Sequence, residues 1–380
     1  MFSANNKISL RQYQVLLIID IFGTSAIFLP RRAAALAGQD GWIALLIAGV
    51  VMAAVAFLMA SAVRACPAES FVGLLSKLLS RPVAVILALL LVLRLWADTA
   101  LELHIFGEIT NRTLLHGTPV FVVCGVMILV GAYAASKGYE TRARIGQIIF
   151  PVIFAPMILL FIFAGIRADW SNLKPVLDTP PGQLAEGAFK LGSSFTGLEF
   201  VLLAFPFINR RKEMPGATVK AVLAIGAFMV AVTMATLAAF GPADAARQVW
   251  PVIQLMDMVY FPGSFLERMD ALVMSFWVLS VFAITNAGFF FSSVVLKDVF
   301  RRGNHLTYLL IGVPVVFAAS FMPFDAATIY KVTDWAFMTF GIFFMVVLPV
   351  VIIVAAGIRR AVDSGKKVKT GAHTGTWTEK

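Results

Sequence analysis

Ten long apolar runs constrain this chain more than any other feature. Each is close to the length of about 20 mainly apolar residues that a helix needs to cross a bilayer. They lie approximately at 12–36, 41–63, 83–109, 118–136, 145–166, 187–208, 217–240, 266–296, 306–322 and 334–357. We therefore predict an all-α polytopic membrane protein with ten transmembrane helices, organised as a single membrane domain over residues 1–380.

The composition excludes a water-soluble globule. Of the 380 residues, 60% are hydrophobic and 14% are charged, whereas soluble domains have roughly 45–50% and about 25%. Soluble nucleases, kinases and metabolic enzymes are therefore excluded. The sequence contains no phosphate-binding GxxxxGK[ST], HExxH or GxSxG motif, and its four histidines are widely spaced. We accordingly expect no enzyme activity, no metal site and no cofactor.

The basic residues orient the chain in the membrane. Of the 31 Lys and Arg residues, 21 fall on one side, among them Arg142 and Arg144, nine fall on the other, and Arg94 lies inside the third run. The net charge of +10 is therefore interpreted as a topology signal that places both termini in the cytosol. Residues 358–380 are predicted to be a disordered, basic cytosolic tail.

Two connecting segments, 69–79 and 246–260, carry apolar stripes at helical spacing. Each predicts an amphipathic helix, which either lies on its own bundle or offers a surface to a partner protein. The pattern alone leaves both alternatives open.

A polar, proline-rich segment at 167–183 divides the chain into two sets of five helices, 11–166 and 184–357. Because five is an odd number, the second set must enter the membrane from the opposite side. This arrangement is an inverted repeat, which is the plan of many secondary transporters.

The first helix of each repeat is predicted to be broken. The first run is interrupted by Gly23, Thr24 and Ser25, and the sixth contains the sequence GSSFTG at 192–197. Thr196 and Glu199 have the spacing of a capping box, which predicts that the sixth helix stops and restarts there. Unpaired backbone groups at membrane depth must face a cavity lined by protein. The alternative is that the small residues only allow close helix packing.

The two breaks predict a ligand site. Restarted half-helices present free N–H groups to a carboxylate, and the ends of the preceding half-helices present carbonyl groups to an ammonium. A compact amino acid would satisfy both, whereas the alternative is that the breaks act only as hinges around water. The predicted ligand-binding residues are Gly23, Thr24, Ser25, Ser193, Ser194, Phe195, Thr196, Gly197, Thr285 and Asn286.

Charged residues in the third run predict a polar path or coupling site. Arg94, Asp98 and Glu102 are four residues apart and therefore share one helix face, and Glu199 of the sixth run is assigned to the same group. The alternative is a purely structural pair between Arg94 and Asp98. Asp20, one turn before the first break, faces either the cavity or the cytosolic vestibule.

Several separated segments resemble one known family. KISLRQYQVLLIIDIFGTSAIFLP, AGQDGWIALL, GYETRARIGQIIFPVIF and FLERMDALVMSFWVLSVF occur in the order found in the spore-germination permeases. These are the integral-membrane B subunits of nutrient germinant receptors and belong to the amino acid–polyamine–organocation superfamily. The resemblance extends from about Lys7 to Arg360. It implies a ten-helix fold of the leucine-transporter type.

The resemblance also implies a function. The protein would lie in the spore inner membrane beside a membrane-attached A subunit and a lipoprotein C subunit. It would bind a small nutrient, often an amino acid, and signal to these partners to trigger germination. The competing function is a proton- or sodium-coupled amino acid transporter, and a water- or ion-conducting channel is a lesser alternative.

Overall fold

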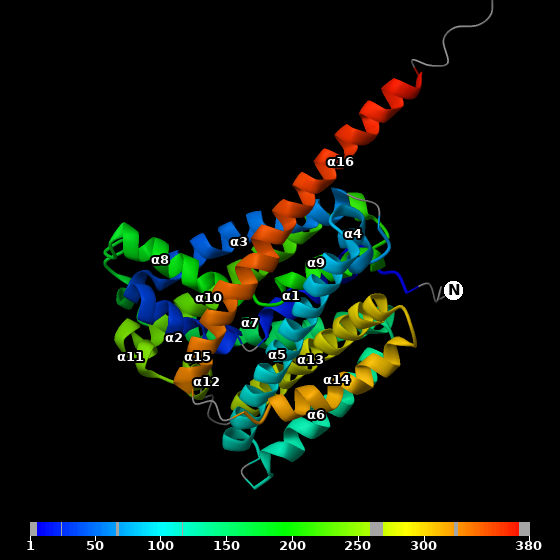
Figure 1. The fold of residues 1–380 in the computed structure, drawn as a ribbon. Coiled ribbons are helices and arrows are strands. Elements are labelled where there is room, and N and C mark those ends of the chain that lie inside the picture. The colour runs from blue at the N-terminus through cyan, green and yellow to red at the C-terminus, as the bar shows by residue number, and fades with distance from the viewer. Residues whose placement is uncertain are drawn as a thin grey trace, which may run out of the picture.

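The computed structural model of the chain describes residues 6–23, 25–65, 68–115, 117–258, 269–322 and 326–371. In these ranges, all ten predicted runs are occupied by helix (Figure 1). The helices of the first repeat are α1 (Leu10–Phe22), α2 (Ser25–Ala37), α3 (Gly41–Ala65), α4 (Phe71–Leu78), α5 (Arg81–Thr113), α6 (Val120–Ser136) and α7 (Tyr139–Arg167). Those of the second are α8 (Pro181–Leu191), α9 (Val201–Ala204), α10 (Met214–Phe240), α11 (Pro242–Arg247), α12 (Pro251–Met258), α13 (Met269–Phe300), α14 (His305–Ala319), α15 (Ala326–Ala336) and α16 (Leu348–Gly371).

The helices have the lengths and composition of membrane spans. Six continuous helical stretches are long and apolar enough to cross a bilayer, and the bent pair that contains α8 and α9 makes a seventh. The apolar helices α6 and α14 are shorter, at 17 and 15 residues. The protein is therefore a multi-pass membrane protein.

The first and sixth spans run in opposite directions. Just before α1, the Ile8 N–H donates to the Phe207 carbonyl at 2.8 Å, and the Asn209 N–H donates to the Ile8 carbonyl at 3.1 Å. At the other end of these spans, the Asp40 carboxylate accepts the N–H groups of Leu177 and Thr179, each at 2.8 Å. The start of α1 thus lies beside the end of the sixth span, as an inverted repeat requires.

Equivalent helices of the two repeats pack against each other. The second helix of one repeat, α3, meets its counterpart α10 at Gly49 and Gly226, where a Cβ on Gly49 would lie 3.8 Å from the Gly226 Cα. The third helix, α5, meets its counterpart α13 where Gly288 leaves room for the Thr99 side chain. Small residues at these crossings let the backbones approach closely, as is common between membrane helices.

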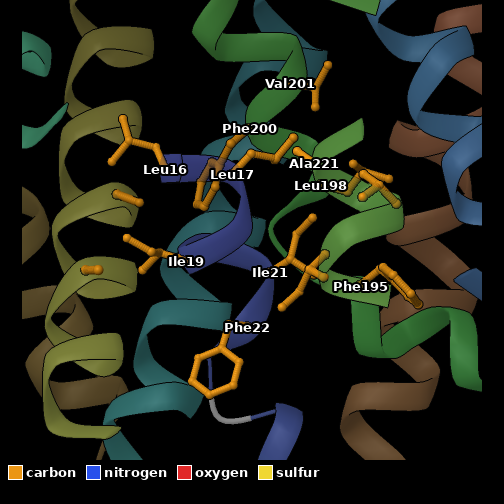
Figure 2. Packing of buried hydrophobic residues seen from close by; sticks show 14 of the residues in the cluster. Leu16, Leu17, Ile19, Ile21, Phe22, Phe195, Leu198, Phe200, Val201 and Ala221 are labelled. Atoms are coloured by element: carbon orange, nitrogen blue, oxygen red, sulfur yellow. The ribbon is translucent and has the colours of Figure 1, made fainter. Parts of the chain in front are cut away.

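A capping box fixes the start of α1. The Ser9 hydroxyl accepts the Gln12 N–H at 3.3 Å, and the Gln12 side chain accepts the Ser9 N–H at 2.9 Å. The pattern Ser-x-x-Gln satisfies two backbone donors that a helix N-terminus leaves free. From this start, Leu17 and Ile21 of α1 enter the apolar core beside Leu198 and Phe200 of the sixth span (Figure 2).

The two amphipathic segments lie on their own bundle. In α4, Phe71, Val72, Leu74 and Leu75 are all buried. The outer segment forms two short helices, α11 and α12, instead of one continuous stripe, because the chain leaves helical geometry around Trp250 before Pro251. Of the predicted apolar stripe, which is Val249, Ile253, Met256 and Tyr260, Ile253 is buried with its neighbours Val252 and Leu255, and Val249 is exposed. Tyr260 lies outside the described residues.

The last helical segment begins before the predicted span, continues beyond it and is irregular in its middle. The apolar span covers Asp334–Arg359, close to the predicted 334–357, and α15 begins before it at Ala326. α16 continues to Gly371, so the chain is helical for fourteen residues beyond the predicted end at 357. Two π-helical turns, Phe337–Gly341 and Phe343–Val347, connect α15 to α16. In Figure 1, α16 extends well past the rest of the bundle.

Candidate functional site

Both predicted helix breaks are present. α1 ends at Phe22, Gly23 follows with φ 26° and ψ −153°, and α2 begins at Ser25. The sixth span bends by 58° where a 3₁₀ turn ending at Phe195 gives way to a second turn beginning at Leu198. Gly197 has φ 98° at this bend, in a region of backbone conformation that favours glycine. Thr24 lies outside the described residues.

The two breaks touch each other. A Cβ added to Gly197 would lie 2.7 Å from the backbone carbonyl oxygen of Asp20, which is far closer than carbon and oxygen normally approach. Only a glycine therefore lets the sixth span pass the last turn of α1 at this distance. The break of the sixth helix is therefore packed directly against the end of α1.

The predicted capping box forms only in part. Glu199 accepts the Gly197 N–H through its Oε2 at 3.0 Å, so the carboxylate does cap the restarted half-helix. The Thr196 hydroxyl, however, donates to the Ser193 carbonyl at 2.8 Å and caps no N–H group. The prediction for Thr196 was wrong because Gly197, with its positive φ, takes the N-cap position.

A cavity of about 470 Å³ lies at the breaks and extends along α5 toward Glu108 and Trp250. Most of the predicted site residues line it. From the breaks these are Gly23, Ser193, Ser194, Thr196 and Gly197, and from the charged group they are Arg94, Asp98, Glu102 and Glu199. Residues distant in sequence, on the first, third and sixth spans, are thus brought to one space.

Three of the predicted residues whose side chains the structure describes do not line this cavity. Phe195 is fully buried, with its ring against Gly49 of α3 and Gly226 of α10, and serves as packing. Thr285 and Asn286 are buried on α13, where Thr285 faces Gly131 of α6. Among the described side chains of α13, their neighbour Ile284 reaches the cavity. Of Ser25, the structure describes only its place as the first residue of α2.

The charges on α5 form the predicted pair and a further link. The Arg94 Nε lies 2.8 Å from the Asp98 Oδ2, so the expected ion pair is present. The Arg94 Nη2 also lies 3.5 Å from the Glu199 Oε1 on the sixth span. Because Glu199 caps the restart at Gly197, Arg94 connects α5 to the break of the sixth helix. Buried charges in membrane helices usually pair in this way.

A second buried ion pair holds the end of α1. Arg142 of α7 donates to the Asp20 carboxylate and, at 3.5 Å, to the Ala283 carbonyl of α13. Arg142 was predicted only as a basic residue on the inner side, but it lies within α7, which begins at Tyr139, and is 3% exposed. A buried carboxylate in an apolar run, such as that of Asp20, is stable only beside a cation. Asp20 was therefore the sequence feature from which a basic partner could have been inferred.

A third polar cluster joins α2 to the last span. Arg32 forms an ion pair of 2.5 Å with Asp334 of α15 and donates to the Ser193 hydroxyl at 2.8 Å. Arg32 lines the cavity. Arg32 was not among the predicted site residues, because it lies two helical turns after the first break, at the end of the first apolar run.

Solved structures with this arrangement define the fold class. A Na⁺-coupled sialic acid symporter matches with a TM-score of 0.61 at 12% identity, covering 94% of this chain and 79% of that chain. MhsT in complex with L-phenylalanine matches with a TM-score of 0.57 at 12% identity, covering 90% and 97%. The chain therefore has the inverted-repeat fold of these transporters, with broken first and sixth helices.

The family follows from sequence comparison. The model of the family described as "Spore germination protein" matches residues 7–329, and this chain belongs to that family. Spore germination protein YndE of Bacillus subtilis (strain 168) is 23% identical over 335 residues, covering 88% of this chain and 92% of the relative. Spore germination protein GerLB of Bacillus cereus is 24% identical over 344 residues, covering 90% and 91%.

Proposed function

We propose that this protein is the membrane subunit of a spore nutrient-germinant receptor and that it binds a small nutrient, an amino acid or a related compound, in the cavity at the two helix breaks. The observation that carries the proposal is the convergence of both breaks, Gly23 and Gly197, on one cavity of about 470 Å³ in a chain of a germination family. A cavity of this size suits a drug-sized or smaller ligand.

The signal in this proposal is a change in how the broken helices pack. Asp20 and Arg142 join α1 to α7, Arg94 and Glu199 join α5 to the sixth span, and Arg32 and Asp334 join α2 to α15. A ligand that binds one arrangement of these helices more tightly shifts the population toward it. Membrane-attached A and lipoprotein C subunits would read the shift, in a spore inner membrane with both termini in the cytosol.

The second candidate function is an amino acid transporter driven by protons or sodium. The observation that favours it is the fold, which the chain shares with a Na⁺-coupled symporter. A fold supports many functions, so the two proposals must be separated by experiment.

The experiment has two arms on the same purified full-length protein. Ligand binding is measured as thermal stabilisation in detergent with a panel of amino acids, since a ligand that binds only the folded state raises its stability. Uptake of each stabilising compound is then measured in proteoliposomes with proton and sodium gradients. A receptor is stabilised without accumulating the compound, whereas a transporter accumulates it. If no compound stabilises the protein, both proposals fail.

A matched pair of variants locates the binding site. Ala97 and Ala54 are both exposed alanines in long membrane helices, but only Ala97 lines the cavity. Ala97→Phe should fill the cavity and remove the stabilisation by ligand, and Ala54→Phe should leave it intact. Equal stabilisation of both variants would place the ligand elsewhere.

A further inference from the structure

The protein's own carboxylates stand at both helix breaks. Glu199 already accepts the Gly197 N–H at the restart of the sixth helix, at 3.0 Å. At the first break, the Glu102 Oε1 lies 3.5 Å from the position that a Cβ on Gly23 would take. The carboxylate of a bound amino acid would therefore meet a filled position at one break and a like charge at the other.

The charged groups around the cavity have an excess of acids. The carboxylates that line it belong to Asp20, Asp98, Glu102, Glu108 and Glu199, and the guanidinium groups that line it belong to Arg32 and Arg94. Asp20 is paired with Arg142 of α7, and Glu108 is paired with Arg112. The imbalance therefore lies among Asp98, Glu102 and Glu199, beside the guanidinium group of Arg94.

The acids also face the cavity more openly than the bases. The side chain of Asp98 is 26% exposed although it pairs with Arg94, and that of Glu108 is 40% exposed although it pairs with Arg112, whereas that of Arg94 is 5% exposed. The second base, Arg32, already pairs with Asp334. A ligand entering the cavity therefore meets accessible negative charge.

Arg94 retains one unused donor. It is buried, and its Nη1 has no hydrogen-bond partner in the part of the chain that the structure describes. Its positive charge, however, already faces two carboxylates, Asp98 and Glu199. A neutral carbonyl oxygen would satisfy this donor, so a third carboxylate is not needed.

We infer that the cavity recognises its ligand through an ammonium group, held between Asp98 and Glu102, and through a neutral carbonyl oxygen at Arg94. The two carboxylates lie one helical turn apart on one face of α5, and an ammonium has three donors to share between them. The ligand class is thus an α-amino carbonyl compound whose free carboxylate is dispensable. This inference rests on the proposed function, because it names the chemistry of the same cavity.

The test compares matched compounds on the full-length protein. Alanine, leucine and phenylalanine are each supplied as the free amino acid, the primary amide and the N-acetyl derivative, at pH 6.5, where an α-amino group is protonated. Binding is measured as the concentration dependence of thermal stabilisation. For at least one side chain, the amide should bind at least as tightly as the free acid and at least tenfold more tightly than the N-acetyl compound.

The outcomes separate the inference from the proposed function. If a free acid or an N-acetyl compound stabilises the protein and the matching amide does not, the inference is overturned and the proposed function stands. If none of the nine compounds stabilises the protein, the proposed function is overturned and the inference falls with it.

Two variants test the assigned residues. Glu102→Gln should weaken amide binding at least tenfold, and Asp98→Asn should do the same if it folds without the full charge of the Arg94 pair. The control is Glu186→Gln, because Glu186 is an exposed acid on α8, outside the cavity lining, that pairs with Lys190 at 2.7 Å. Unchanged amide affinity in Glu102→Gln would refute the assignment, whether or not Asp98→Asn folds.

Discussion

Replacement of Gly197 by alanine should be among the costliest single-methyl additions in this protein. Gly197 has φ 98°, and an added Cβ would lie 2.7 Å from the Asp20 carbonyl oxygen. A left-handed backbone costs a non-glycine residue about 1–2 kcal/mol. Overpacking against a backbone atom that cannot rotate away adds about 1–3 kcal/mol. The expected loss of unfolding free energy is therefore about 2–5 kcal/mol.

Two other glycines separate these contributions. Gly38 has φ +53° but an added Cβ meets nothing within 4 Å, so Gly38→Ala carries only the backbone cost of about 1–2 kcal/mol. Gly216, in the first turn of α10, has open space and no positive φ. Gly216→Ala should be neutral or stabilise by up to about 1 kcal/mol, since alanine is the better helix former.

The assay is unfolding of the three purified variants in mixed micelles, compared with the unaltered protein under one set of conditions. The predicted order of stability is Gly216→Ala, then Gly38→Ala, then Gly197→Ala. An equal loss of unfolding free energy in Gly197→Ala and Gly38→Ala would refute the close contact between Gly197 and the Asp20 carbonyl, and with it the contact between the two helix breaks.

Three further predictions concern the ion pair, the outer loop and the topology. Asp20→Leu should cost about 3–5 kcal/mol of unfolding free energy because it leaves Arg142 charged and buried. The double variant with Arg142→Met should recover most of that loss, and a double variant as unstable as the single one would count against the pairing. Asp40→Ala should cost about 1–3 kcal/mol of unfolding free energy, since two backbone N–H groups lose a charged acceptor. Asp40→Asn should have a stability between those of Asp40→Ala and the unaltered protein. Equal stability of all three would show that Asp40 does not stabilise the loop at 177–179. In a background without native cysteines, a membrane-impermeant maleimide should label Ser171→Cys but not Asn304→Cys in intact cells, and the reverse pattern would invert the proposed orientation.

The fold could be predicted from the sequence because each signal is local. The breaks at 23–25 and 192–197 are groups of small residues within apolar runs, and the positions of the ten runs follow from hydropathy alone. Their pairing as first and sixth helices then follows from counting five helices on either side of a polar linker. These features require no knowledge of which helix faces touch.

The orientation of side chains on buried helices could not be predicted in the same way. Thr285, Asn286 and Ile284 are adjacent on α13, a helix that is apolar on all sides, and only Ile284 reaches the cavity. When every face of a helix is buried, polarity does not distinguish the face toward the cavity from the face toward another helix. The polar pair was therefore assigned to the wrong face.

The ion pair within one helix could be predicted, but the pairs between distant segments could not. Arg94 and Asp98 are four residues apart on one helix, so their pairing follows from helical geometry. The pairs Asp20–Arg142 and Arg32–Asp334 join residues that are 122 and 302 positions apart. Such contacts depend on tertiary packing, which periodicity in one sequence does not report.

The most direct test of this account is a cryo-electron microscopy structure of the full-length protein with the compound that stabilises it most. We expect ligand density at the two helix breaks, beside Gly23 and Gly197, with the amino nitrogen within hydrogen-bonding distance of Asp98 or Glu102. Ligand density only outside this cavity would contradict the central claim that the paired breaks form the binding site.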